Sequence, residues 1–172
     1  MKPTLRIAGC LLILLLLAPA ACKISYTFSG TSIQSDVKTI CIEPVVNRAT
    51  KVNPALANQL TEALNDKFRK LTSLEQVTEE GDLNLLVTIE SYDVRATAIT
   101  AEEVAAMNRL TITCKIQFTN ILHPEDNIDG QSFASYEDYD SNYSLDMVED
   151  QLCETIVNKL VDDIFNATVA QW

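Results

Sequence analysis

One cysteine near the start of the chain stands in a context where a lipid could be attached to its thiol. Lys2 and Arg6 precede an apolar run at residues 11–17, and small residues at 18–21 lead directly to Cys22. A basic, an apolar and a small-residue region in this order are typical of an export signal. The apolar run is shorter than the roughly 20 residues that a membrane span needs. The sequence therefore predicts that the protein is exported.

Two cleavage sites compete at the end of this signal. Ala18-Pro19-Ala20 fits the A-x-A pattern of ordinary secretion, which would release a soluble periplasmic protein. Ala21-Cys22 instead suits lipoprotein processing, in which the cysteine is acylated and becomes the new N-terminus. Pro19 stands where bacterial lipoprotein signals usually carry Leu, Val or Ile. We favour lipid attachment at Cys22, with a signal peptide at residues 1–21 and a single mature domain at 22–172, and the A-x-A alternative stays open.

The residues that usually carry catalysis are almost missing from this chain. Its one histidine, His123, lies in a polar turn beside Pro124, where we expect an exposed loop residue. No G-x-S-x-G, glycine-rich phosphate loop, H-E-x-x-H or cysteine–histidine pairing occurs. We therefore expect no enzyme activity, no catalytic residue and no cofactor. A hydrolase that uses two of the 24 acidic residues is the weaker alternative.

One acidic stretch partly fits a calcium-binding loop. Six oxygen-bearing residues occupy positions 1, 3, 5, 7, 9 and 12 of that template: Asp138, Asp140, Asn142, Ser144, Asp146 and Glu149. Position 6, however, is Tyr143, where the sharp turn of a calcium loop calls for glycine. We therefore favour a solvated acidic turn that caps the following helix, and expect no metal.

Three further cysteines follow Cys22, namely Cys41, Cys114 and Cys153. Each lies in an apolar stretch, and none has the C-x-x-C spacing of a zinc or redox site. We expect them to be small buried apolar side chains. One disulfide among the three remains an alternative, because an exported protein meets an oxidising compartment.

The hydrophobic patterns predict an α+β fold with a single mixed or mostly antiparallel sheet and two amphipathic helices packed on one of its faces. The clearest strand spans residues 109–121, where apolar and polar residues alternate. The first helix follows Asn53-Pro54, a typical helix start, and the second follows Ser144. The expected strands are 24–28, 37–43, 74–78, 83–97, 109–121 and 132–139, and the expected helices are 54–71 and about two dozen residues after 144. A loop is expected at 101–106 and a turn at 123–130.

The charge of the chain excludes one large class of partner. The formal net charge is −11, and removal of Lys2 and Arg6 with the signal brings it to about −13. Such an acidic protein repels nucleic acid unless basic residues gather locally. We therefore expect no nucleic-acid partner.

Several segments together resemble the lipopolysaccharide (LPS)-assembly lipoproteins of the LptE family. The segments are 22–30 (CKISYTFSG), 47–48 (NR), 60–64 (LTEAL), 107–112 (MNRLTI) and 160–166 (LVDDIFN). The similarity is one of pattern and extends over essentially the whole mature chain.

The resemblance implies a non-enzymatic α/β domain, anchored by its N-terminal lipid to the periplasmic side of the outer membrane. It further implies that the domain sits as a plug inside the β-barrel protein LptD and helps lipopolysaccharide reach the outer leaflet. The alternative function is that of a periplasm-facing lipoprotein that binds a small ligand or another envelope complex.

Lipopolysaccharide is anionic, so an acidic protein could contact it only through a local basic patch. Arg95, Arg109 and Lys115 fall on or beside neighbouring expected strands. We expect some of these three residues to contact lipopolysaccharide, and the alternative is that they are ordinary surface charges on a sheet.

Overall fold

The computed structural model describes residues 33–51, 53–97 and 106–169. The predicted signal peptide at 1–21, Cys22 and the predicted strand at 24–28 lie outside the described residues. All but the last residue of the predicted loop at 101–106 lies outside them too.

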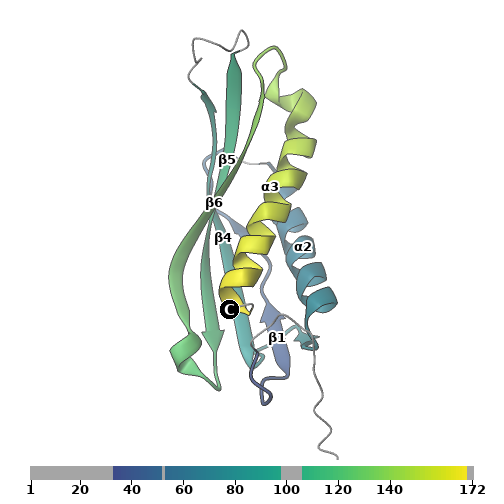
Figure 1. The fold of residues 1–172 in the computed structure, drawn as a ribbon, viewed down its shortest axis with the longest axis vertical. Coiled ribbons are helices and arrows are strands. Elements are labelled where there is room, and N and C mark those ends of the chain that lie inside the picture. The colour runs from purple at the N-terminus through teal and green to yellow at the C-terminus, as the bar shows by residue number, and fades with distance from the viewer. Residues whose placement is uncertain (1–32, 52, 98–105, 170–172) are drawn as a thin grey trace, which may run out of the picture.

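The described chain forms one mixed sheet and two long helices, which confirms the predicted α+β class (Figure 1). In chain order the elements are β1 (Thr39–Ile42), β2 (Val46–Asn47), α2 (Leu56–Leu71), β3 (Glu75–Val77), β4 (Leu83–Ala96), β5 (Met107–Asn120), a 3-10 turn η1 (Pro124–Asp126), β6 (Ile128–Asp140) and α3 (Leu145–Thr168).

The sheet has a parallel and an antiparallel half. Its strand order is β3-β1-β4-β5-β6, and the short β2 also pairs with β4. β1 runs parallel to both β3 and β4, whereas β4, β5 and β6 follow one another as antiparallel neighbours. The antiparallel half is built from long strands that are adjacent in the sequence, and it forms most of the sheet.

The alternation in β5 places its apolar side chains on one face of the sheet. Leu110, Ile112, Cys114 and Ile116 are fully buried, whereas the residues between them are not. Their partners Val87, Ile89 and Tyr92 on β4 are buried and Val94 is partly buried, because the antiparallel register sets apolar residues opposite one another. The hydrophobic core therefore lies against one face of the sheet.

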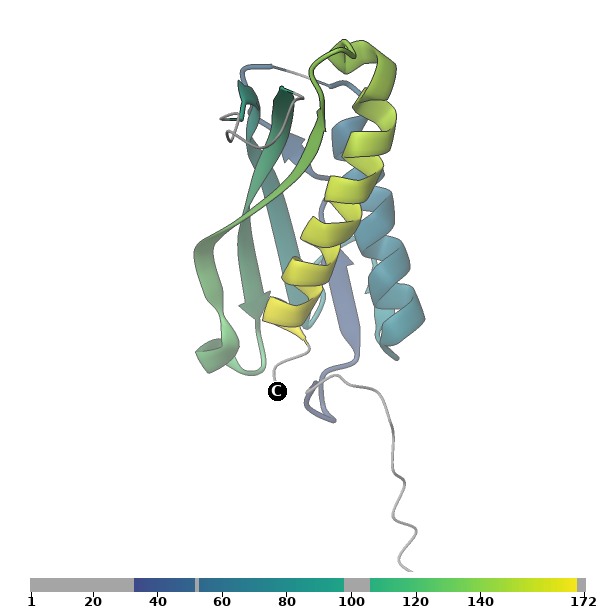
Figure 2. The same cartoon turned by 45° about the horizontal axis from the view of Figure 1, so that its top comes forward.

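Both helices cover this apolar face, as predicted (Figures 1 and 2). α2 buries a residue every four positions, Leu56, Leu60, Leu64 and Phe68, because it needs only a narrow apolar stripe. α3 packs against α2 as well as β5 and β6, and accordingly its buried stripe is wider. Phe68 of α2 meets Phe165 of α3 edge to face, with ring centroids 5.1 Å apart. No helix in the described part of the chain is long and apolar enough to cross a membrane.

The main differences from the sequence prediction are the start of the first helix, the start of β6 and the presence of β2. The first helix begins at Leu56, because the Asn53 side chain forms a local turn by accepting a hydrogen bond from the backbone N–H of Ala55 at 2.9 Å. β6 begins at Ile128, so it takes in residues 128–130, which were predicted as turn. β2 was missed, because a two-residue strand leaves no periodic signal.

The corner that joins β1 to β4 depends on close backbone contact. A Cβ atom added at Gly81 would lie 3.0 Å from the backbone nitrogen of Cys41 and 3.1 Å from the carbonyl carbon of Ile40. Next to it, the Asp82 carboxylate accepts hydrogen bonds from the backbone N–H groups of Lys38 and Thr39, at 2.8 and 3.0 Å. These bonds lower the pKa of Asp82 below its ordinary value.

We predict that Gly81→Ala destabilises the protein by about 1–3 kcal/mol, because the new methyl group pushes β1 away from β4. The measurement is the free energy of unfolding in urea. Gly130→Ala is not a neutral comparison, since Gly130 has a positive φ of 80°. The matched control is Ala134→Gly at an exposed strand position. This substitution should lower the free energy of unfolding by about 1 kcal/mol or less. A Gly81→Ala protein as stable as the parent would contradict the close packing of Gly81 against β1.

Candidate functional site

The face of the sheet away from the helices is uncovered by any described element, and we call it the open face. On β5 it consists of Arg109, Thr111, Thr113, Lys115, Gln117 and Thr119. A bulge in β4 between Ile89 and Ser91 shifts the alternation, so Ser91, Asp93 and Arg95 point to the same side as these residues. The open face is therefore polar and rich in threonine along most of its length.

Two of the three predicted basic residues meet on the open face. Arg95 of β4 lies directly opposite Arg109 of β5. Two like charges at such a cross-strand pair repel each other. The structure offsets this repulsion with a carboxylate beside each arginine, Asp93 at 3.6 Å from Arg95 and Asp138 at 2.7 Å from Arg109.

Arg109 is held firmly, whereas Arg95 is nearly free. Arg109 donates two hydrogen bonds to the Asp138 carboxylate, at 2.7 and 2.8 Å, and this lowers the pKa of Asp138. Its guanidinium also lies 3.7 Å from the ring centroid of Tyr136, in a cation–π contact. The Arg95 side chain, by contrast, is 81% exposed. Arg95 is thus the arginine that an anionic ligand could reach most easily.

Lys115 lies apart from the two arginines. It follows Arg109 by six positions on β5, which corresponds to roughly 20 Å along a strand. Its aliphatic stem passes over Gly130, where a Cβ atom would lie 2.8 Å from Lys115 Cε. Gly130 is the unpaired residue of a bulge in β6, and its positive φ suits glycine. Lys115 forms no ion pair within the part of the chain that the structure describes.

Charge is distributed unequally between α3 and β5. β5 contains two basic residues and no acidic one. α3 contains one basic residue, Lys159, and six acidic ones: Asp146, Glu149, Asp150, Glu154, Asp162 and Asp163. α3 is therefore acidic and β5 basic, whereas α2 has one more basic than acidic residue and β6 adds Asp129 and Asp138 to the open face.

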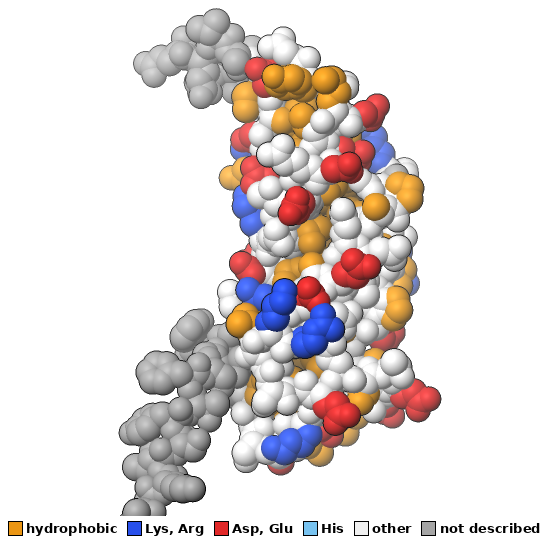
Figure 3. All heavy atoms as spheres, turned by 90° about the vertical axis from the view of Figure 1, so that its right-hand side faces the viewer, with side chains coloured by type: hydrophobic (Ala, Val, Ile, Leu, Met, Phe, Trp, Pro, Cys, Tyr) orange, Lys and Arg blue, Asp and Glu red, His pale blue; other side chains and the backbone are white. Residues whose placement is uncertain are grey.

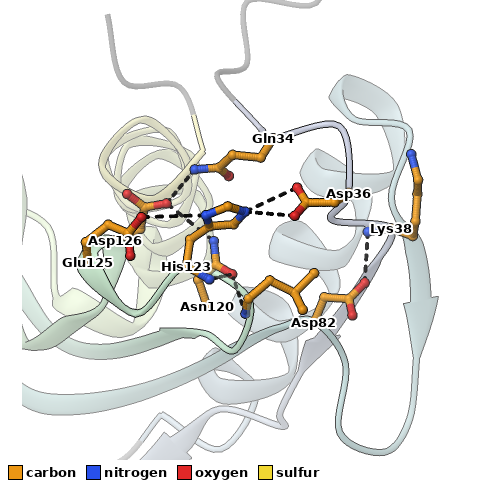
Figure 4. Close-up of polar contacts among 9 residues, drawn as sticks. Gln34, Asp36, Lys38, Asp82, Asn120, His123, Glu125 and Asp126 are labelled. Carbon is orange, nitrogen blue, oxygen red and sulfur yellow. Dashed lines mark hydrogen bonds and ion pairs between the residues drawn. The ribbon is translucent and has the colours of Figure 1, made fainter.

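A polar cluster at one end of the sheet holds the segment that leads back toward Cys22 (Figure 4). Nε2 of His123 lies 3.0 and 3.2 Å from the two carboxylate oxygens of Asp36, and Nδ1 lies 3.6 Å from Glu125. The hydrogen bond to Asp36 raises the pKa of His123, and the same bond lowers the pKa of Asp36. His123, predicted as an exposed loop residue, thus links the segment before β1 to the turn after β5, and its side chain is 26% exposed.

Gln34 and Asn120 complete this connection. Gln34 donates a hydrogen bond to Asp126 at 2.7 Å, across 92 residues of sequence. The buried Asn120 accepts hydrogen bonds from the backbone N–H groups of Leu122 and His123, which shapes the turn. A small cavity of about 40 Å³ lies beneath Gln34, beside the last residues of α3. It has room for about one water molecule and not for an organic ligand.

The cysteines are placed as buried, unreactive side chains. Cys41, Cys114 and Cys153 are all buried and free. Burial raises the pKa of Cys114 to about 12 and that of Cys153 to about 11. A thiol with such a pKa stays protonated near neutral pH and is a poor nucleophile.

The acidic stretch does not fold as a calcium loop. Asp138 is bound to Arg109 on the open face, and Glu149 accepts a hydrogen bond from the hydroxyl of the buried Tyr92 on the core side. Asp140 accepts one from the backbone N–H of Asn142. Since β6 continues through Asp140, the carboxylates are spread along a strand and a helix. Among the described residues no group of three or more metal-ligating side chains converges.

The family model for lipopolysaccharide assembly, LptE, matches residues 37–168 of the chain, which include every described strand and helix. The chain belongs to the LptE family. A comparison with curated proteins finds no match.

Three solved structures have a similar fold at very low sequence identity. They are a neuraminyllactose-binding hemagglutinin homolog from Helicobacter pylori (TM-score 0.55, 9% identity, 81% of this chain and 87% of that one), a hypothetical protein from Chlamydia trachomatis (0.52, 8%, 78% and 99%) and uncharacterized lipoprotein B from Nitrosomonas europaea (0.51, 8%, 74% and 79%). At these identities the likeness shows the arrangement of strands and helices alone.

The sequence predicted that Arg95, Arg109 and Lys115 lie on or beside neighbouring strands. It did not predict the orientation of Arg95 or the contacts of Arg109 with Asp138 and Tyr136. Arg95 faces the same side as Arg109 only because of the bulge in β4, which has no clear signal in the sequence. The roles of Asp138 and Tyr136 follow from pairing between β5 and β6. The turn expected at 123–130, between the strands expected at 109–121 and 132–139, could have suggested these neighbours, although it does not fix the register.

We predict that the His123–Asp36 pair stabilises this LptE-family protein in a pH-dependent way. The folded-state pKa of His123 lies above its ordinary value of 6.5, so its contribution is complete below that value and is lost as pH rises through the raised pKa. Asp36 has a lowered pKa, so its contribution is present above 3.8 and is lost as pH falls through the lowered pKa. The measurement is the free energy of unfolding of the parent and of His123→Gln from about pH 4 to pH 9. The free energy of unfolding of the parent should exceed that of His123→Gln most between about pH 4 and 6.5. A difference between the two proteins that does not vary with pH would refute the prediction.

Proposed function

We propose that this protein is an outer-membrane lipoprotein, acylated at Cys22 after removal of residues 1–21, that partners the β-barrel protein LptD in lipopolysaccharide transport. In this proposal it occupies the barrel as a plug and performs no catalysis. Membership of the LptE family supports the role in lipopolysaccharide assembly.

The observation that carries the plug proposal is the polarity of the open face. A sheet covered on one side only normally leaves its other side to water or to a partner. Here that side presents mostly threonine, glutamine, serine and a few balanced charges along the three longest strands, with Leu86, Ala134 and Tyr136 among them. The lumen of an outer-membrane barrel is likewise polar, so such a face could lie against it without burying apolar groups in an unsuitable environment.

The distribution of charge favours the open face as the surface for lipopolysaccharide. Phosphate and sugar-acid groups would be repelled by the six carboxylates of α3 and attracted by the basic residues of β5. Arg95, Arg109 and Lys115 all project from the open face. We propose Arg95 and Lys115 as the residues that contact the anionic groups, and Arg109 as the residue that orders the surface beside them.

The position of the N-terminal segment agrees with anchoring through Cys22. The polar cluster around His123 fixes residues 34–36 at one end of the sheet. Eleven residues separate Cys22 from Gln34, and an extended chain of that length reaches at most about 40 Å. A lipid on Cys22 would therefore keep this end of the domain close to the membrane surface.

The plug proposal predicts a directional contact with a large β-barrel protein. A photo-cross-linking residue at Thr113, in the centre of the open face, should capture LptD in the native envelope. The same residue at Thr155, an exposed position on α3, is the matched control for general proximity. The measurement is a mild-detergent pull-down with mass spectrometry of the cross-linked partner and of the mature N-terminus.

We expect roughly equimolar LptD, a cross-link from Thr113 that exceeds the one from Thr155, and an acylated Cys22. An unlipidated protein without any barrel partner would refute the proposal and favour the small-ligand or other-complex alternative. A barrel captured from Thr155 alone would retain the partner and refute the open face as the contact surface.

The lipopolysaccharide proposal predicts that the exposed basic residues matter for binding. Arg95→Ala combined with Lys115→Ala should weaken binding to purified lipopolysaccharide by about 5–20-fold, since each removes one charge-assisted contact. Arg69→Ala is the matched control, because Arg69 is an exposed arginine on α2, in the other layer. Binding is measured by isothermal titration at low and high salt. An equal loss of affinity in the double variant and in Arg69→Ala, or no loss in the double variant, would contradict the assignment of Arg95 and Lys115 to lipopolysaccharide binding.

A further inference from the structure

The turn that follows β5 exposes two adjacent aliphatic side chains. Ile121 is 46% exposed and Leu122 is 45% exposed, and we call this pair the apolar tip. The tip lies at the end of the molecule where β5 and α3 both end (Figure 1). Two large apolar side chains side by side in a turn are a contact surface in search of an apolar partner.

The backbone donors of the tip are already bound within the protein. The N–H of Ile121 donates a hydrogen bond to the carbonyl of Asp82 at 2.9 Å. The N–H groups of Leu122 and His123 both donate to Oδ1 of Asn120, at 3.1 and 3.0 Å, and the next residue is a proline without an N–H. An N–H group that loses water in an apolar medium is strongly unfavourable unless it is bonded elsewhere. The tip can therefore enter an apolar medium without leaving an N–H unsatisfied.

The predicted anchor leads to the same end of the molecule. Gln34 is bonded to Asp126 and Asp36 to His123, so the segment at residues 34–36 lies beside the turn that carries the tip (Figure 4). Eleven residues separate Gln34 from Cys22, and an extended chain of that length reaches at most about 40 Å. A lipid on Cys22 would therefore hold a membrane close to the tip.

Two other surfaces suit a membrane less well. Figure 3 shows charged side chains along the whole length of the helix side, and these would lose water if that side lay flat on a bilayer. Tyr143 and Met147 are exposed beside the start of α3, at the opposite end of the domain. The 14 residues of β5, which run between the two ends, span roughly 46 Å. That distance exceeds the reach of the chain from Cys22, so the anchor favours the tip.

The charges around the tip favour a zwitterionic lipid over an anionic one. His123 is paired with two carboxylates, Asp36 at 3.0 Å and Glu125 at 3.6 Å. Asp126 lies in the same turn. These acidic groups would be repelled by anionic headgroups. Attraction to a bilayer must therefore come from burial of the apolar side chains, which depends on their area and not on lipid charge.

We propose that Ile121 and Leu122 insert into a zwitterionic phospholipid surface beside the lipid on Cys22. This proposal rests on the anchor proposed above. A lipid anchor alone holds the domain near the membrane and leaves its orientation free, whereas the anchor and the tip together make the domain stand on this end. The long strands then lead away from the membrane, and the open face is turned sideways. This contact orients the lipoprotein before it meets a barrel in the same membrane.

The experiment measures cross-linking to phospholipid by a diazirine-bearing aliphatic residue at position 122. The full mature chain is coupled through Cys22 to a maleimide lipid in vesicles of phosphatidylcholine and phosphatidylethanolamine. The cysteines of the described residues are buried and stay unreactive. The same diazirine residue at Met147, which is 72% exposed at the opposite end, is the matched control. Mass spectrometry should find at least about fivefold more phospholipid attached at position 122 than at position 147.

One variant and one change of lipid test the physical basis of the contact. Ile121→Ser should lower cross-linking from position 122 by at least about threefold, because it removes about half of the apolar surface of the tip and keeps the backbone bond to Asp82. Val46→Ser is the matched control, since Val46 is 41% exposed on β2 in the middle of the sheet, and it should change nothing. Partial replacement of the zwitterionic lipids by phosphatidylglycerol should lower the cross-linking at low salt.

Equal phospholipid cross-linking from positions 122 and 147 would overturn the proposal, and so would cross-linking from position 122 that Ile121→Ser leaves unchanged. Cross-links between two protein molecules in place of lipid would assign the tip to a second copy of the chain and overturn it as well. The maleimide lipid supplies the anchor and the vesicles contain no barrel, so these results depend neither on acylation in the cell nor on LptD. Acylation of Cys22 and capture of LptD from Thr113 are measured separately, and failure of one proposal is not mistaken for failure of the other.

Discussion

Burial of one face of the sheet is the constraint on which the rest of this molecule depends. The alternation in β4 and β5 places most of their large apolar side chains on the same side, so both helices pack there. A slip of one residue in the pairing would turn that apolar row toward water, and the burial of the row therefore fixes the register as well. The open face is polar for the same reason, because it consists of the alternate positions of those strands. The surface proposed for the partner is thus a consequence of how the core is formed.

Contacts between distant parts of the chain join the first strands to this antiparallel half. β4, β5 and β6 follow one another in sequence, so their pairing closes only short loops. β1 and β3 instead pair in parallel across a helix, which costs more chain entropy. The carboxylate of Asp82 offsets part of this cost by binding the backbone at the start of β1, while Gly81 lets the two strands approach. Asp36 and His123 add a second connection at the same end, which orders the segment toward the N-terminus.

The sequence allowed the main elements to be predicted wherever one element carries its own periodic signal. The strand at 109–121 and the two helices are of this kind, and each was found within a few residues of its observed ends. Features that need two distant segments were not accessible in this way. The parallel pairing of β1, the bulge in β4 that turns Arg95 toward Arg109, and the partnership of His123 with Asp36 all depend on contacts made after folding. The candidate site was therefore predictable in its residue types and not in its arrangement.

The acidic net charge of −11 does not conflict with an anionic ligand on the open face. The acids of α3 lie in the helix layer, and a helix is about 10–12 Å across. The Debye length at physiological salt is about 8 Å. Charges on the outer side of α3 are therefore separated from the open face by more than one Debye length. At that separation their repulsion is largely screened, whereas Arg95 and Lys115 would act at contact distance. Local charge on each layer, more than the total, decides which ligand that layer can bind. On the open face Asp93 and Asp138 already pair with the two arginines, so Lys115 is the basic residue there whose charge is least matched by the described residues.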